Sequence, residues 1–320
     1  MASTSSAATV QVTEQGVDTV AEITRNGKTF EARTASGFSF IVGSTTNFTD
    51  DMKRTGLFQG SSAVNDSKKF GVYDAASYVG AFGPWAHFIE PTLTAEGGAR
   101  FATINTYDRA AFTFGAPQLA AHTPNANFIE YFRLLLALPD ADKHFPELSL
   151  RSSAAGQATV HLADGPGFKD LETVIEVTRP NGKKEKQLAF LMSYLNSSPT
   201  AVDDAELRAA ARLMNWLRLD PRAKELQIKV FIDAAQAKLT RAKKKIASFT
   251  GDDWRIALWI MDITHQGRGS LDDVAKALAS AKPEAQLRLI GAPKYQTRID
   301  TVSAAMDKLQ NLGVLEGFKV

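Results

Sequence analysis

The 320-residue sequence contains no cysteine. This absence excludes a disulfide scaffold, a zinc site built from thiolates and a cysteine nucleophile. The chain also lacks a charge excess, because 37 Lys and Arg residues face 35 Asp and Glu residues. No overall basic field therefore indicates a nucleic-acid partner. No apolar run approaches the ~18 residues that a membrane-spanning helix needs, so we expect neither nucleic acid nor a membrane span among its interactions.

Common catalytic motifs are missing as well. The five histidines form no H-E-x-x-H pattern, which argues against a metalloprotease. No G-x-S-x-G, P-loop or G-x-G-x-x-G motif stands between a strand and a helix, so the acyl-hydrolase, NTPase and dinucleotide-binding interpretations fail. We expect no metal and no organic cofactor. The chemistry that remains is that of carboxylates.

The hydrophobic pattern predicts a mainly α (α+β) protein. Turn signals at Asn26-Gly27 and at Pro180-Asn181-Gly182 indicate two β-hairpins, over 20–34 and 172–190. We expect the two hairpins to meet in one small β module, because neither is stable alone in water. Helical spacing covers most of the chain from residue 203 onward, over 203–219, 221–247, 252–264, 270–281 and 295–311.

These elements suggest two parts, an N-terminal β-rich segment over 1–66 and a helical domain over 67–320 with a β-hairpin insertion around 151–192. The Gly/Ser/Ala-rich stretch 149–170 is interpreted as a linker or loop. The basic run that begins at Lys238 is interpreted as a solvated helix face.

One window of the sequence carries residues suited to carboxylate chemistry. It runs from Glu96-Gly97-Gly98 through Asp108 to Thr113. A glutamate at the end of a hydrophobic helix is partly removed from water, which raises its pKa and suits it to protonating a leaving oxygen. The two glycines stop the helix and allow a close approach of chain or substrate. A β-rich ribbon then brings a second carboxylate and a hydroxyl toward the glutamate, as glycoside hydrolysis requires.

This window resembles the active-site stretch of phage-type lysozymes, and it is especially similar to bacterial and phage N-acetylmuramidases with an E-G-G motif. The segment WIMDITHQGRGSLDDVAKAL (259–278) looks like a later helix of those enzymes. The resemblance implies a lysozyme-like fold with two helical lobes and a small sheet. It also implies that Glu96 is the general acid, Asp108 the second carboxylate and Thr113 the residue that holds the water. Polar groups expected in the cleft are Asn105, Tyr107 and Gln118.

The sequence departs from that family at three places. The stretch between Glu96 and Asp108 is longer, Arg109-Ala110-Ala111 replaces the expected glycines, and His265 stands where an asparagine is usual. A second alignment also fits: Glu90, eighteen residues before Asp108, resembles the spacing of lysozyme-like chitosanases. Glu90 ranks behind Glu96 because it precedes Pro91, which disfavours helical geometry there, and it is kept as a substrate-binding candidate.

The resulting hypothesis is a glycosidase that cleaves β-1,4 bonds in peptidoglycan or a related amino-sugar polymer. The alternatives are a chitosanase-like hydrolase and a non-catalytic wall-binding or phage structural protein. The first residues lack the basic start and apolar run of a secretory signal. We therefore expect synthesis in the cytoplasm and action at the cell envelope after non-classical export or lysis, with an immunity, delivery or phage-particle protein as a candidate partner.

Overall fold

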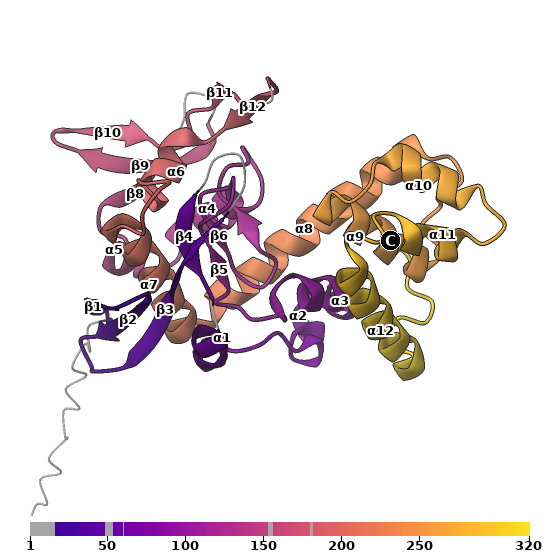
Figure 1. The fold of residues 1–320 in the computed structure, drawn as a ribbon, viewed down its shortest axis with the longest axis horizontal. Helices are drawn as coiled ribbons and strands as arrows, with labels where there is room; N and C mark the ends of the chain where they lie inside the picture. The colour runs from indigo at the N-terminus through magenta and orange to yellow at the C-terminus, as the bar shows by residue number, and fades with distance from the viewer. Residues whose placement is uncertain (1–16, 49–53, 60, 153–155, 180–181) are drawn as a thin grey trace, which may run out of the picture.

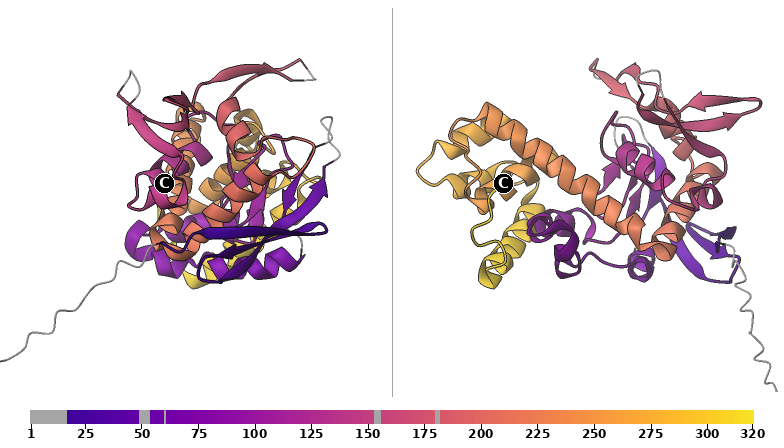
Figure 2. Two further views of the ribbon diagram at one scale, coloured as in Figure 1. Left: turned by 90° about the vertical axis from the view of Figure 1, so that its left-hand side faces the viewer. Right: turned by 180° about the vertical axis from the view of Figure 1, so that it is seen from behind.

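The computed structural model describes residues 17–48, 54–59, 61–152, 156–179 and 182–320. Figure 1 shows two lobes that lie side by side. The 25-residue helix α8 (Pro221–Lys245) runs from one lobe to the other, and the view from behind in Figure 2 shows it uninterrupted. We call the part that contains the strands the sheet lobe and the other part the helical lobe.

The sheet lobe is organised around one antiparallel sheet whose strands are neighbours in sequence order. Its strands are β1 (Val20–Asn26), β2 (Thr29–Thr34), β3 (Ser39–Asn47), β4 (Thr55–Phe58), β5 (Ile104–Asn105), β6 (Thr113–Phe114) and β7 (Leu119–Ala120). Buried side chains alternate with exposed ones along β2, where Phe30 and Ala32 contribute to the core. Helix α7 (Asp204–Leu219) packs against β1 and β3.

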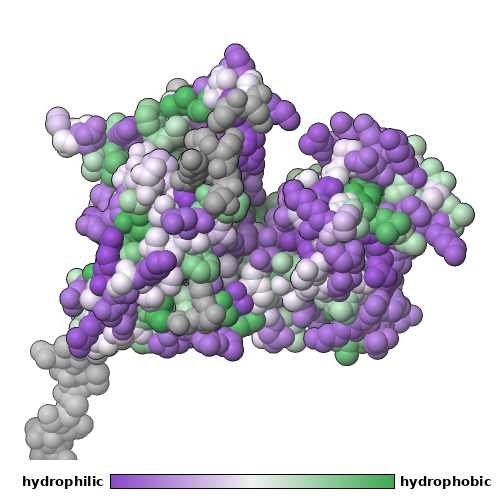
Figure 3. Space-filling model, viewed as in Figure 1, coloured by the Kyte–Doolittle hydropathy of each residue, from purple (hydrophilic) through white to green (hydrophobic). Residues whose placement is uncertain are grey.

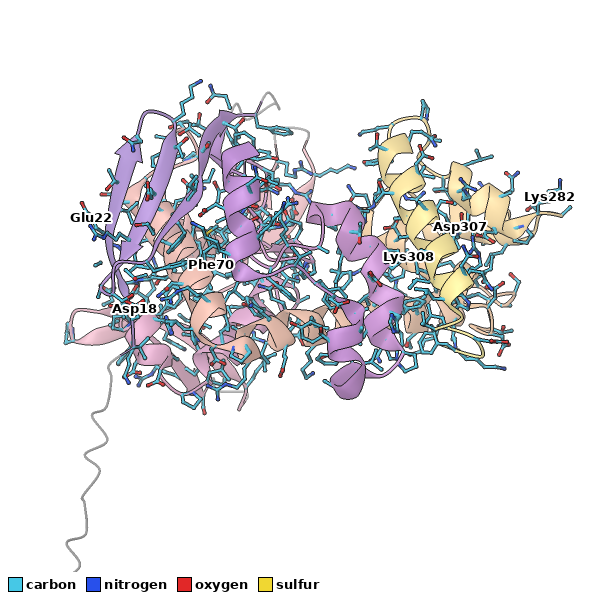
Figure 4. The ribbon with its side chains drawn as sticks, turned by 90° about the horizontal axis from the view of Figure 1, so that it is seen from below. Asp18, Glu22, Phe70, Lys282, Asp307 and Lys308 are labelled. Atoms are coloured by element: carbon cyan, nitrogen blue, oxygen red, sulfur yellow. The ribbon has the colours of Figure 1, made fainter. Side chains whose placement is uncertain are left out.

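The first predicted hairpin is confirmed with a shifted turn. Asn26 pairs with Thr29, so the two-residue loop consists of Gly27 and Lys28 rather than Asn26 and Gly27. Gly27 has a φ of +60°, which a two-residue hairpin loop requires at this position and which glycine adopts without strain. The start of β1 is held by α7, because Arg218 pairs with Asp18 at 2.5 Å; Figure 4 labels Asp18 beside this end of the sheet.

Two smaller sheets complete the sheet lobe. One has three strands, β8 (Leu148–Ser152), β9 (Ala158–Asp164) and β10 (Gly167–Asp170), and the other has two, β11 (Ile175–Thr178) and β12 (Lys184–Gln187). The prediction of a linker over 149–170 is therefore wrong. The prediction that the two hairpins form one β module is also wrong, since β1 and β2 continue into β3 while β11 and β12, among the described strands, pair only with each other. Part of the second predicted turn, at residues 180–181, lies outside the described residues.

The helices divide between the two lobes. The sheet lobe contains α1 (Ser61–Ser67), the 3-10 helix η1 (Lys68–Phe70), α4 (Phe128–Leu136), α5 (Ala141–His144), α6 (Ala189–Leu195) and α7. The helical lobe contains the 3-10 helix η2 (Ala75–Tyr78), α2 (Val79–Phe82), α3 (Trp85–Gly97), α9 (Trp254–Gln266), α10 (Leu271–Leu278), α11 (Pro283–Leu289) and α12 (Gln296–Leu312). Helix α3 packs against α9 and α12, so an early helix joins the late ones. None of the described helices is long and apolar enough to cross a membrane.

The predicted mainly α, lysozyme-like fold is wrong. The described chain has a seven-stranded antiparallel sheet and two further sheets, and strands make up 20% of it against 46% helix. The physical reason is one strand pairing: Phe58 of β4 pairs with Asn105 of β5. This pairing joins the N-terminal strands to the short strands of the predicted small sheet, so strands on both sides of residue 66 share one sheet.

Helix α3 ends as its sequence predicts. Gly98 has a φ of +65°, and the N–H groups of Gly98 and Ala99 donate to the carbonyl oxygens of Thr94 and Leu93. A Cβ on Gly97 would lie 3.1 Å from the side chain of Thr103, so the absent side chain allows the chain after the helix to pack closely. Contrary to the expectation that Pro91 disfavours helical geometry at Glu90, α3 continues through both residues. The glycine pair thus places Glu96 in the last turn, next to the sheet lobe.

Candidate active site between the two lobes

A cleft of about 550 Å³ lies between the sheet lobe and the helical lobe, where Figure 3 shows the surface hollowed. Its walls come from the end of α3, the strands β5 to β7 with their loops, α8 and the end of α9. The lining residues are Glu96, Asn105, Asp108, Arg109, Ala110, Thr113, Gln118, Ala120, His122, Thr123, Asn127, Lys238, His265 and Gln266.

The structure brings together five of the seven residues proposed from the sequence. Glu96, Asp108 and Thr113 all line the cleft, and so do Asn105 and Gln118. Glu96 comes from the helical lobe, whereas the other four belong to β5, β6 and their loops. The cleft therefore has a glutamate on one wall and an aspartate with a threonine on the other.

The other two residues lie elsewhere. The Tyr107 ring packs on Phe48, with 5.4 Å between ring centroids. The carboxylate of Glu90 faces Lys308 of α12 at 4.0 Å, and Figure 4 labels Lys308 on that helix, beside α3. Neither Tyr107 nor Glu90 lines the cleft. The geometry therefore favours the alignment that uses Glu96 over the one that uses Glu90.

Two basic side chains hold the carboxylate of Glu96. Arg298 Nη1 lies 2.8 Å from Glu96 Oε1, and His265 Nε2 lies 3.1 Å from the same oxygen. The Glu96 side chain is 13% exposed. Burial raises its pKa, but the hydrogen bond and charge of His265 and the charge of Arg298 outweigh burial and lower the pKa below its ordinary value. The prediction that the pKa of Glu96 is raised is thus wrong for the free protein. The sequence indicated the burial of Glu96 but not its two basic partners.

A buried ion network fixes Arg298. Arg298 Nη2 lies 2.7 Å from Asp262 Oδ1, and Arg268 Nη2 lies 3.3 Å from Asp262 Oδ2. Thr92 of α3 donates a hydrogen bond to Asp262 at 3.3 Å. The side chains of Asp262 and Arg268 are fully buried. Helices α3, α9 and α12 therefore meet at one carboxylate, which positions the guanidinium that holds Glu96.

Sequence reasoning missed Arg298, Asp262 and His265 as site residues. Asp262 and His265 stand at i and i+3 on α9, within the segment that carries the second resemblance, so their shared helix face was a usable signal. Arg298 follows no local motif and reaches Glu96 from a helix about two hundred residues further along. Only the packing of α12 on α3 shows its role.

The loop that carries Asp108 is held from behind. Asp108 Oδ1 accepts the N–H of Ala110 at 2.9 Å, which folds the loop into a tight turn. Asn196, at the end of α6, donates from Nδ2 to the carbonyl oxygens of Thr106 at 3.2 Å and Ala111 at 2.9 Å. Ala111 has a φ of +58°, a conformation that costs energy for a residue with a Cβ. Asn196 therefore ties both ends of the Asp108 loop to α6.

Polar groups on the sheet side of the cleft are suited to binding hydroxyl and amide groups. Asn105 donates to Gln118 Oε1 at 2.5 Å, and Gln118 donates to the Gly115 carbonyl oxygen at 2.8 Å. The Thr113 hydroxyl is buried, in a residue that is 6% exposed, and it has no hydrogen-bond partner among the described residues. A buried polar atom without a partner calls for an explanation, and a water or sugar hydroxyl in the cleft would satisfy it.

Cations also line the cleft. Burial lowers the pKa of Lys238, and no acidic side chain among the described residues pairs with it. The interpretation of the basic run as a solvated helix face is therefore wrong for Lys238, whereas it is confirmed for Arg241, Lys243, Lys244 and Lys245, which are exposed. Arg109 adds a guanidinium at the rim. Burial and the charge of Arg109 lower the pKa of His122, against the opposing charge of Glu185. The cleft is thus lined by two cations, Arg109 and Lys238, as well as by the carboxylates of Glu96 and Asp108.

A buried glutamate supports the Asp108 loop from the other side. Glu206 of α7 is fully buried, and its Oε1 accepts hydrogen bonds from the Leu57 N–H at 2.9 Å and from the Thr106 hydroxyl. Burial raises the pKa of Glu206 from 4.5 to about 7, against these hydrogen bonds. The folded protein therefore holds a proton on Glu206 at a pH where the unfolded chain has lost it.

We expect Glu206 to destabilise the protein as the pH rises. The contribution of Glu206 to the free energy of unfolding is fully present below pH 4.5, falls between pH 4.5 and about 7, and is constant above. At about 1.36 kcal/mol per pKa unit, the loss amounts to about 3 kcal/mol. Urea unfolding at pH 4 and pH 8 measures this loss. Between the two pH values, the free energy of unfolding of the wild type should fall by about 3 kcal/mol relative to that of the Glu206→Gln variant. The exposed control Glu225→Gln should show no such change, and equal pH profiles for all three proteins would contradict the prediction.

Among the described residues, no three His, Cys, Asp or Glu side chains come together in a group that could hold a metal ion. The chain was also compared with known proteins. No family model, no curated protein and no solved structure matches it.

Proposed function

We propose that the protein is a glycoside hydrolase that cleaves β-1,4 bonds in peptidoglycan. One observation carries the proposal: a single interlobe cleft holds Glu96 on one wall and Asp108 with the buried Thr113 hydroxyl on the other, and that hydroxyl has no partner in the part of the chain that the structure describes. Glycoside hydrolysis needs an acid at the glycosidic oxygen and a carboxylate that acts on the opposite face of the sugar. An open cleft between two lobes also admits a polymer chain.

The three side chains have distinct roles in this mechanism. At a pH low enough for Glu96 to hold a proton, Glu96 gives it to the glycosidic oxygen, so that the leaving sugar departs as an alcohol. Asp108 takes a proton from a water that the Thr113 hydroxyl holds, and the oxygen of that water forms a bond to the anomeric carbon. After the step Glu96 is ionised and Asp108 protonated, and one proton exchanged with solvent restores both. The amides of Asn105 and Gln118 would bind the sugar beside the bond.

The charges of the cleft favour an anionic polymer over a cationic one. A chitosan-cleaving site would be expected to carry an acidic excess, whereas the lining here has the cations Arg109 and Lys238 beside the carboxylates of Glu96 and Asp108. Because Lys238 is a half-buried cation without an acidic partner among the described residues, a substrate carboxylate would stabilise it. Peptidoglycan carries carboxylates on its sugars and peptides, so it fits this cleft better.

Digestion of purified peptidoglycan sacculi tests the proposal. The wild type should release soluble fragments with new reducing ends, and it should release none from chitosan under the same conditions. Asp108→Asn, which keeps the shape of the side chain, should slow release by about 10²–10⁴-fold. Fragments without new reducing ends would indicate cleavage of a different bond, and tight binding to sacculi without turnover would indicate a wall-binding protein. Either result would overturn the proposal.

A further inference from the structure

A second cavity, of about 290 Å³, adjoins the cleft on the side of β11 and β12. We call it the arginine pocket. Arg109 lines both cavities, so the two are neighbours. The arginine pocket is lined by Arg54, Thr106, Arg109, Ala111, Val177, Thr178, Arg179, Gln187, Met192, Ser193, Asn196 and Pro199.

The pocket combines positive charge with an apolar wall. Of its charged lining residues, all three are arginines: Arg54, Arg109 and Arg179. Glu185 lies 3.7 Å from Arg109 and 3.7 Å from Arg179, which is too long for a good hydrogen bond. One carboxylate thus faces two guanidinium groups at a distance and leaves their donors able to bind an anion. Guanidinium groups are suited to carboxylates because they donate two parallel hydrogen bonds.

The pocket is also coupled to the proposed active site through the backbone. Thr106 and Ala111, which flank the Asp108 loop, form part of its wall, and Asn196 lines it while donating to both of their carbonyl oxygens. An occupant of the pocket therefore lies next to the loop that carries Asp108. A side branch of a polymer bound in the cleft would reach the pocket past Arg109.

We propose that the arginine pocket binds the peptide branch of the polymer, a short peptide that ends in a carboxylate. The carboxylate pairs with Arg109 and Arg179, and the small apolar side chains of the peptide pack on Val177, Met192 and Pro199. This inference rests on the proposed function, since it names the part of the substrate that this pocket recognises. One wall of the pocket comes from β11, β12 and α6, so these elements would provide substrate specificity.

A substitution at Arg179 tests the arginine pocket separately from the cleft, because Arg179 lines the pocket and not the cleft. The probe is the synthetic tetrapeptide L-Ala-D-isoglutamine-L-Lys-D-Ala, titrated into the full-length protein by calorimetry. Arg179→Gln should weaken its binding about tenfold or more, as expected for a lost charged hydrogen-bond pair. The matched control is Lys184→Gln, which removes a positive charge from an exposed, paired residue of the same hairpin and should leave binding unchanged.

Rates of glycan cleavage distinguish a wrong assignment of the arginine pocket from a wrong assignment of the hydrolase activity. On intact sacculi, Arg179→Gln should raise KM about tenfold with kcat unchanged, and on glycan strands stripped of peptide it should behave as the wild type. No tetrapeptide binding by the wild type, an equal loss on both substrates, or Arg179-dependent binding of inorganic phosphate alone would overturn the inference. Tetrapeptide binding without turnover of any glycan would instead overturn the proposed hydrolase and leave a peptide-binding pocket.

Discussion

Glu96→Gln is expected to slow the release of reducing ends from sacculi by about 10²–10⁴-fold, the usual cost of removing a general acid. Glutamine has the shape of glutamate and no proton to transfer to the glycosidic oxygen. The fold should survive, because Arg298 keeps its contacts with Asp262 and the carbonyl oxygen of glutamine can accept the hydrogen bonds that Glu96 Oε1 accepts. The measurement is the initial rate at saturating sacculi, with circular dichroism to confirm folding.

Glu90→Gln is the matched control for this prediction. It changes the same atoms on the same helix, one and two-thirds turns earlier, at a residue that faces Lys308 and not the cleft. Its turnover should stay close to that of the wild type. An inactive Glu90→Gln protein beside an active Glu96→Gln protein would show that the chitosanase-like alignment is the right one.

The pH dependence of turnover should reflect the two basic partners of Glu96. Because they lower its pKa, Glu96 loses its proton at a lower pH than an ordinary glutamate, and turnover should fall as the pH rises above that value. His265→Asn removes a hydrogen bond that lowers the pKa of Glu96, so the decrease in turnover should begin at a higher pH. Rates measured from pH 3 to pH 8 test this prediction. A decrease in turnover at the same pH as in the wild type, or at a lower pH, would contradict it.

Asp262→Ala is expected to destabilise the protein by about 3–5 kcal/mol, the usual cost of breaking a buried ion pair. Asp262 is fully buried and is the carboxylate shared by Arg298 and Arg268. Its removal leaves the fully buried Arg268 side chain without this counter-charge. Urea unfolding at neutral pH measures the loss of free energy.

Asp307→Ala provides the comparison, because Asp307 on α12 is 62% exposed and pairs with Arg255 at 2.9 Å. An exposed ion pair contributes about 0–1 kcal/mol, so this variant should unfold close to the wild type. A loss below about 1 kcal/mol for Asp262→Ala would show that water or neighbouring groups compensate the two arginines. The network would then not be what holds α3, α9 and α12 together.

The sequence by itself determined the features that depend on neighbouring residues. Gly97 and Gly98 end α3 directly after Glu96, and Asn26 to Thr29 form a hairpin loop, because backbone conformation and local hydrogen bonds decide both. The same reasoning located α7, α8, α9, α10 and α12 but missed the short helix α11. It also placed Glu96, Asp108 and Thr113 near one another, since a helix end followed by a short ribbon leaves few arrangements.

Only the tertiary structure decided what depends on residues far apart in the chain. Phe58 pairs with Asn105 and merges two predicted β regions into one sheet, which overturned the predicted fold class. Arg298 reaches Glu96 and, together with His265, reverses the expected direction of its pKa. The residues in these strand pairs and ion pairs are close in space but far apart in the sequence, so no periodicity or local motif predicts the contacts. The local pattern therefore identified the carboxylates, while the pKa of Glu96 depended on the packing of α9 and α12 against α3.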